Sequence, residues 1–216
     1  MTVMNFNINT EKYVIEKSYD FLDMNESKIS ELFKTEGELT IHDGMLKMKT
    51  TNNKNPRLHA AISPKFKLTE DVKKLEIQVN GLKTFNSALG ELHFDFSITN
   101  NSGTYVAVSN RVIIAKKQGT SLPAKHLHYD LSKYPQRNKD YTVQFDFVEN
   151  SLSTFLGDQI LDKVLLEEDF YSYIKNNFSE FEMEFRLKNG YEGSPADFTQ
   201  YHVEAGIRQI KFRLYY

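Results

Sequence analysis

Alternation of apolar and polar residues with a period of two dominates this chain and most constrains its fold. Between residues 39 and 214 the alternation recurs in short runs, separated by turn signals about every eight to fifteen residues. Side chains on a strand alternate between its two faces, so each run predicts a half-buried β-strand. About ten to thirteen short strands and one or two short helices predict an all-β protein, a two-sheet antiparallel jelly-roll sandwich.

Two stretches carry the alternation most clearly. Residues 39–48 alternate on both sides of His42-Asp43-Gly44, which is the pattern of a β-hairpin. Residues 143–164 predict three consecutive strands, with turns at Glu149-Asn150 and at Gly157-Asp158. Strands joined by such tight turns favour antiparallel pairing between sequence neighbours.

Helical spacing occurs in two places only. Ser27 is expected to cap a short helix that runs through Leu32, and residues 167–177 are expected to form a second helix. No repeat or Pro/Gly/Ser-rich linker divides the chain. We therefore expect a single sandwich domain over residues 1–216, with residues 1–36 as an N-terminal extension packed on it.

Composition excludes several function classes. The 216 residues are 40% hydrophobic and 26% charged, as in a soluble globular protein. A net charge of −2 provides no basic field for nucleic acid or an anionic bilayer, so neither is an expected partner. The expected partner is a small-molecule or glycan ligand, and exposed edge strands leave monomer and homodimer both open.

The chain has no cysteine, which excludes disulfides, thiolate metal sites and a Cys nucleophile. Its first ten residues lack the basic and apolar segments of a signal peptide, so a cytoplasmic location is expected. Gly-x-Ser-x-Gly, phosphate-loop and His-Glu-x-x-His motifs are also missing from the sequence. Phosphoryl transfer and dinucleotide chemistry are therefore not expected.

A resemblance to a known superfamily rests on the C-terminal part of the chain. The run from Asp140 to Asp162 resembles consecutive strands of the concanavalin A-like lectin and glucanase domains. Those domains usually have an Asp-Gly turn where this chain has Gly157-Asp158. The final run, Gly206 to Tyr216, is similar to the strand that commonly ends such domains. The resemblance implies a jelly-roll fold that hosts lectins, hydrolases, lyases and structural modules alike.

The most informative segment for chemistry is residues 90–96. On a strand, Leu92 and its apolar alternates would enter the core, while Glu91, His93 and Asp95 would form a row on the other face. The laminarinase and lichenase-type β-glucanases of the superfamily carry a Glu-x-Asp-x-Glu row on a concave strand. There the outer pair serves as nucleophile and general acid. The resemblance thus implies Glu91 and Asp95 as catalytic carboxyls, with His93 as the residue that tunes them.

This row departs from the glucanase pattern in two ways. Asp95 is one methylene shorter than Glu, although a retaining pair must bring its carboxyls to ~5–5.5 Å. His93 would tune its neighbours by charge and hydrogen bonding rather than by sharing a proton. The alternative is a solvated strand face without chemistry, because any antiparallel strand with one wet face has a polar row at this spacing.

Two further polar rows could contribute to the same cleft. His126, His128 and Asp130 would share one face of a strand and could offer two imidazoles and a carboxylate to Zn²⁺, or simply face solvent. The other row is His202 and Glu204, beside Tyr201. If all three rows lie on the concave sheet, one cleft would hold them.

The remaining binding candidates are aromatic and charged residues. Sugar rings stack on aromatic faces, and without tryptophan this chain must use tyrosine. The loop 189–197 could wrap Ca²⁺ with Glu192 and Asp197. No cofactor is required by any motif, and Zn²⁺ and Ca²⁺ are the ions that could bind. The expected ligand-binding residues are Tyr105, Arg111, His128, Tyr129, Tyr201, His202 and Glu204.

Three functions fit these residues. The first is a jelly-roll protein that acts on a carbohydrate or similar small polar molecule in the concave-sheet cleft, by glycosidase-like acid–base chemistry of the hydrolase or lyase type. The second is a non-catalytic glycan-binding module, which explains the departures of the glucanase row. The third is an intracellular enzyme of small-molecule metabolism that reuses the fold.

Overall fold

The computed structural model describes the backbone of residues 14–36, 38–49, 57–62, 68–85, 90–100, 105–109, 112–117, 120–121, 125–126, 139–166, 179–189 and 204–216. Side chains are described for residues 14–34, 39–49, 62, 68–82, 140–166 and 205–216. Within these ranges, no helix has both the length and the apolar character that a membrane crossing requires.

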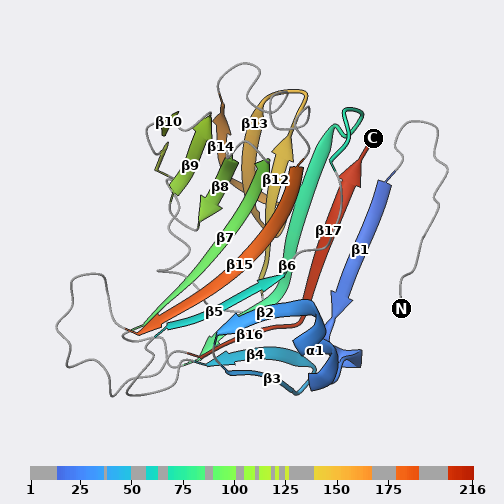
Figure 1. The fold of residues 1–216 in the computed structure, drawn as a ribbon, viewed down its shortest axis with the longest axis vertical. Coiled ribbons are helices and arrows are strands. Elements are labelled where there is room, and N and C mark those ends of the chain that lie inside the picture. The colour runs from blue at the N-terminus through green and yellow to red at the C-terminus, as the bar shows by residue number, and fades with distance from the viewer. Residues whose placement is uncertain are drawn as a thin grey trace.

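Strands make up almost all regular structure in the described residues (Figure 1). The two helical elements are the 3₁₀ turn η1 (Phe21–Asp23) and the helix α1 (Glu26–Leu32). The strands are β1 (Val14–Asp20), β2 (Phe33–Glu36), β3 (Glu38–His42), β4 (Met45–Lys49), β5 (Arg57–Ile62), β6 (Lys74–Phe85), β7 (Gly90–Asn100), β8 (Tyr105–Ser109), β9 (Val112–Lys117), β10 (Thr120–Ser121), β11 (Lys125–His126), β12 (Lys139–Asp146), β13 (Ser151–Leu156), β14 (Gln159–Leu165), β15 (Ser179–Asn189), β16 (Glu204–Ile207) and β17 (Gln209–Tyr215).

These strands form two sheets with antiparallel pairing. Sheet A has the order β14-β13-β12-β6-β16-β4-β3, and β17 joins it by pairing with β6 on one side and β1 on the other. Sheet B has the order β10-β9-β8-β7-β15-β5-β2, with β11 beside β9. The predicted all-β class with two antiparallel sheets is confirmed. The division into residues 1–36 and a sandwich stays a prediction.

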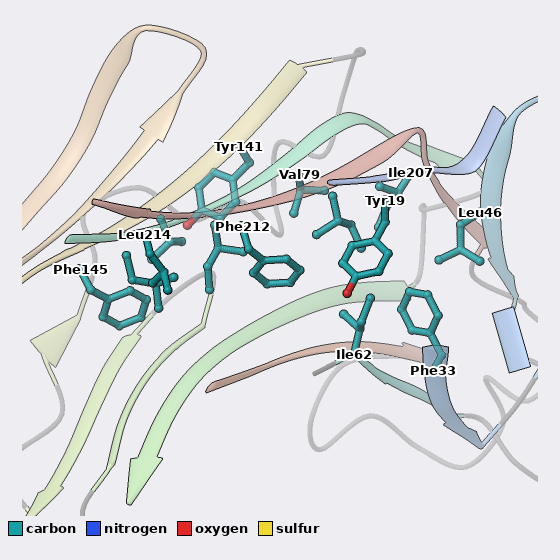
Figure 2. Close-up of a cluster of buried hydrophobic side chains, with 14 of the residues drawn as sticks. Tyr19, Phe33, Leu46, Ile62, Val79, Tyr141, Phe145, Ile207, Phe212 and Leu214 are labelled. Carbon is teal, nitrogen blue, oxygen red and sulfur yellow. The ribbon is translucent and has the colours of Figure 1, made fainter. Parts of the chain in front are cut away.

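The core lies between the two sheets (Figure 2). On β17, Ile210, Phe212 and Leu214 are buried, whereas the residues between them are half-buried. Sheet B contributes Ile62 to the same cluster, and Phe33 of β2 packs there as well. Burial of alternate residues is what the period-two pattern requires, so the apolar alternation of the sequence is realised as a sheet-on-sheet core.

Two predicted turns are confirmed. Asp43 and Gly44 join β3 to β4 with φ of 54° and 65°, as a two-residue type I′ turn requires. Gly157 has φ of 59° in the two-residue turn between β13 and β14, and glycine reaches that conformation without steric cost. Asp146 stabilises the turn before β13, because its Oδ1 accepts hydrogen bonds from the backbone N–H groups of residues 148 and 149, each at 3.0 Å.

The predicted helix cap is wrong by two residues. Asn25 caps α1, and its Oδ1 accepts a hydrogen bond from the backbone N–H of Lys28 at 3.1 Å. Ser27 lies inside the first turn and its Oγ donates to the same Asn25 oxygen at 2.8 Å. Both residue types are good caps, and Asn25 is the one whose own backbone is extended, as an N-cap requires. The predicted helix over 167–177 lies outside the described residues.

Strand β6 changes partners halfway along its length. It pairs with β17 up to Asn80 and with β16 from Lys83 onward. Gly81 lies at this change with φ of 64°, and its N–H donates to Asp140 Oδ1 at 3.2 Å. Arg208 separates β16 from β17, and its N–H donates to the Asn80 carbonyl at 3.0 Å. One bend therefore lets two consecutive strands share one long neighbour.

We expect Gly81→Ala to destabilise the protein by about 2–3 kcal/mol. A Cβ at this position would lie 2.8 Å from Arg208 Cδ and 3.0 Å from Arg208 Cβ. The positive φ alone costs a residue with a Cβ roughly 1–2 kcal/mol, and the overpacking adds to it. Urea denaturation measures the loss.

Gly157→Ala is the matched control for Gly81→Ala. Its φ of 59° is similar, but nothing lies within 4 Å of the added Cβ. It should lose only the conformational part, roughly 1–2 kcal/mol. Equal losses in the two variants would show that the contact with Arg208 contributes nothing.

A charged network on the outer face of sheet A ties β1 to the sheet. Arg213 Nε donates to Glu16 Oε2 at 2.7 Å, and its Nη1 donates to Glu76 Oε1 at 2.8 Å. Partial burial opposes the charge of Arg213, but the hydrogen bonds to Glu16 and Glu76 outweigh that effect and raise its pKa. The network links β1, β17 and β6, so it anchors residues from both ends of the chain to one sheet.

Candidate functional site

The candidate catalytic row lies on β7, which is a central strand of sheet B. Strand β7 pairs with β15 along its whole length and with β8 over its second half. In this register, Glu91 is opposite Lys188, His93 is opposite Arg186, and Asp95 is opposite Glu184. Figure 1 shows β7 and β15 running side by side as long neighbouring strands.

The register places the row on one face of the sheet. Ile62 is fully buried in the core; it is opposite Met183, which in turn is opposite Phe96 of β7. Opposite positions in an antiparallel sheet share a face, so Phe96 is at a core-facing position. Because successive residues alternate, Glu91, His93 and Asp95 are at positions on the face turned away from the core. Their side chains are outside the described part of the structure.

The shape and length of β7 limit how close the carboxyls of Glu91 and Asp95 can come. Figure 2 shows the broad pale-green ribbon of β7 bowed toward the core side chains, so its outer face lies on the hollow side of the bend. Four residues along a strand separate Cα atoms by about 13 Å. Retaining glycosidases need carboxyls ~5–5.5 Å apart and inverting ones ~6.5–9.5 Å. Glu91 and Asp95 would therefore reach either spacing only by leaning toward the position of His93.

One predicted binding residue lies on the same face as Asp95. Tyr105 begins β8 and is opposite Thr99, while Ser109 ends β8 and is opposite Asp95. Tyr105 and Ser109 are four residues apart and thus at positions of the same face. A tyrosine position therefore lies on the same face as the candidate row, four residues along the sheet from Asp95.

Of the other predicted residues with a described backbone, one lies on the opposite sheet and one on sheet B. Glu204 begins β16, where it pairs with Lys49 and Phe85 in sheet A, so the three polar rows do not all lie on one sheet. His126 is opposite Val112 on the short strand β11, beside β9 of sheet B. The remaining predicted ligand-binding and metal residues lie outside the described residues: Arg111, His128, Tyr129, Asp130, Tyr201 and His202, with Glu192 and Asp197 of the calcium loop.

Metal binding stays a prediction. Among the side chains that the structure describes, no group of three or more His, Asp or Glu could hold a metal ion. That search does not reach the row of His126, His128 and Asp130, because those side chains are outside it.

The sequence did not indicate that the charged positions of β15 lie beside the candidate row. Residues 181–188 alternate apolar and polar side chains, which indicates a strand, but nothing in the alternation indicates which strand lies beside it. The register now aligns four strands in one row, with Glu36, His59, Arg186 and His93 at successive positions. Pairing between segments about ninety residues apart carries no local sequence signal.

Comparison with known proteins yields structural likeness only. No protein-family model matches the sequence, and no curated protein matches it. A β-1,3-1,4-glucanase (lichenase) from a mouse hindgut metagenome superposes with a TM-score of 0.53 at 8% identity, covering 91% of this chain and 98% of that one. An endo-acting O-glycanase of the human gut microbiota gives 0.57 at 10% identity, covering 93% and 97%.

A lectin-like protein is equally similar. Arcelin-5, a defence protein from Phaseolus vulgaris, superposes with a TM-score of 0.55 at 13% identity, covering 92% of this chain and 98% of its own. Hydrolases and a lectin-like protein thus match the chain over nearly their whole lengths. At identities of 8–13%, a structural likeness shows the fold of this chain. The chain has the concanavalin A-like jelly-roll fold.

Proposed function

We propose that the protein binds a carbohydrate on the outward face of sheet B and cleaves it with Glu91 and Asp95. The observation that carries this proposal is the register of β7, which places both carboxyl positions with His93 on one face of a central strand, away from the core. The fold shared with a lichenase and an O-glycanase supports the same chemistry.

In this proposal the two carboxyls divide the work of glycoside cleavage. One donates a proton to the leaving oxygen, while the other acts as nucleophile or activates a water. His93 lies between them and tunes them by charge and hydrogen bonding. Tyr105, on the same face, provides an aromatic surface for a sugar ring.

A non-catalytic glycan-binding module is the second candidate. Asp95 in place of Glu shortens the reach of one carboxyl, and His93 occupies the centre of the row, so the row departs from a glucanase at two positions. The likeness to arcelin-5 favours this candidate as well. An intracellular enzyme acting on a small non-sugar molecule is a third candidate, and a cytoplasmic location belongs to that proposal.

The test is a panel of soluble polysaccharides and oligosaccharides, screened first for thermal stabilisation and then for release of reducing ends. A ligand at 100 times its Kd adds about 2.7 kcal/mol of stability, which a melting curve detects. Glu91→Gln and Asp95→Asn should each lower turnover about 100-fold while the glycan still stabilises the variant. Ser97→Ala is the matched control, because it lies on the same face of the same strand.

The outcomes separate the candidates. Stabilisation without release of reducing ends favours the non-catalytic module. A panel in which no glycan stabilises the protein contradicts both carbohydrate proposals and leaves the small-molecule enzyme. Turnover that survives both carboxyl substitutions would show that cleavage occurs elsewhere in the molecule.

A further inference from the structure

Charges of opposite sign stand opposite the two candidate carboxyls. Lys188 of β15 is opposite Glu91, whereas Glu184 of β15 is opposite Asp95. Directly opposite positions of an antiparallel pair have Cβ atoms about 4.5–5.5 Å apart. The register therefore sets a lysine position opposite one carboxyl position and a glutamate position opposite the other.

Among the described positions, the other neighbours of the two carboxyls do not cancel this difference. Arg186 is one step diagonal to both Glu91 and Asp95, so its charge acts on the two alike. Glu182 is diagonal to Asp95 only and adds negative charge on that side. Across β8, Asp95 is opposite Ser109, which is uncharged, with Ala107 at the diagonal position. His93 lies two residues from each carboxyl along β7.

We propose that β15 divides the roles of the two carboxyls: Lys188 favours the ionised form of Glu91, and Glu184 favours the protonated form of Asp95. A nearby opposite charge favours the ionised form of a carboxyl, and a like charge at the same separation disfavours it. Lys188 and Glu184 are thus positioning residues, which act through Glu91 and Asp95. The proposal gives the row the asymmetry that glycoside cleavage requires, one carboxylate and one carboxylic acid.

The inference rests on the proposed function for its biological meaning only, because the protonation of the two carboxyls can be measured without any substrate. Carboxyl ¹³C resonances of Glu91 and Asp95, followed from pH 3 to pH 9 in the full chain, report each titration midpoint. In Glu184→Gln, the titration midpoint of Asp95 should fall by about 1 pH unit. In Lys188→Met, the titration midpoint of Glu91 should rise by about 1 pH unit.

Conservative and neighbouring variants make the measurement specific. Glu184→Asp and Lys188→Arg keep the charges, so they should leave both midpoints close to wild type. Glu182→Gln removes a charge that is only diagonal to Asp95, about 7–8 Å away, and should lower its midpoint by less than Glu184→Gln does. If Glu184→Gln proves unstable, the Glu91 midpoint in Lys188→Met and Lys188→Arg tests the same division of roles.

An Asp95 midpoint that is unchanged in Glu184→Gln, or a Glu91 midpoint that is unchanged in Lys188→Met, overturns the proposal. Shifted midpoints in a protein that cleaves no glycan mean that the charge division is correct and the proposed function is not. Where turnover is present, its alkaline limb should move to lower pH in Glu184→Gln, which a merely structural role of Glu184 would not produce.

Discussion

Phe212→Ala is expected to destabilise the protein by about 3–5 kcal/mol, which is a large part of the stability of an ordinary domain. Phe212 is fully buried and lies in the middle of the core cluster (Figure 2). It packs edge-on against Tyr19 of β1, with ring centroids 6.0 Å apart, and it is opposite Ile77 of β6. Truncation would leave a cavity where three strands of sheet A meet, and close-packed neighbours can fill it only in part.

Two controls on β17 separate the cavity from a general effect on the strand. Lys211→Thr changes the half-buried residue on the opposite face and should cost less than about 1 kcal/mol. Phe212→Leu keeps most of the buried volume and should fall between Lys211→Thr and Phe212→Ala. Chemical denaturation gives all three values. A Phe212→Ala variant within 1 kcal/mol of wild type would mean that the site collapses without loss.

Strand positions and tight turns could be predicted because both are local properties of the sequence. The hairpin at Asp43-Gly44 needs two residues with positive φ between alternating runs, and that requirement is visible in four or five letters. Burial of alternate residues on β17 likewise follows from the period of two. These features are written within single segments, so one sequence is enough to find them.

Partner choice among strands could not be predicted in this way. Strand β17 pairs with β6, whose residues are well over a hundred positions earlier, and no period reports such pairing. The exchange of partners at Gly81 depends on a bend that forms against Arg208, far along the chain. Long-range contacts of this kind follow from the whole core rather than from any one run of residues.

The same division applies to the candidate site. Alternation predicts that Glu91, His93 and Asp95 share a face, since that depends on β7 alone. The charges that stand beside them come from β15 and are known only from the register. In the proposed chemistry, the neighbours of each carboxyl decide its role. The alternation could not predict those neighbours, because they lie on another strand.

High pH should destabilise the protein through two buried tyrosines. Burial raises the pKa of Tyr19 to about 12 from the ordinary 10.0. Burial, followed by the charge of Asp162, also raises the pKa of Tyr141, although a hydrogen bond with Thr154 opposes the shift. Both residues are nearly fully buried, at 5% and 1% exposed, so ionising either hydroxyl in the folded state would place a negative charge inside the core.

The sign follows from linkage. A group whose pKa is higher in the folded state contributes its full stability below the unfolded pKa of 10 and loses it as the pH rises through the folded value. For Tyr19 alone the loss is about 1.4 kcal/mol at pH 11 and approaches about 2.7 kcal/mol above pH 12, and Tyr141 adds to it in the same direction. Below pH 9 the two tyrosines stay protonated in both states, so they should contribute nothing to the pH dependence of stability.

The double variant Tyr19→Phe, Tyr141→Phe isolates this contribution, because phenylalanine fills the same space and cannot ionise. Urea denaturation at pH 8 and pH 11 should show a smaller loss in the double variant than in wild type, by at least about 1.4 kcal/mol. Lysine deprotonation affects both proteins alike and cancels in the comparison. If wild type and double variant lose the same stability between these two pH values, the tyrosine hydroxyls are not sealed in the core, because accessible phenols would ionise near pH 10 in the folded and unfolded chain alike.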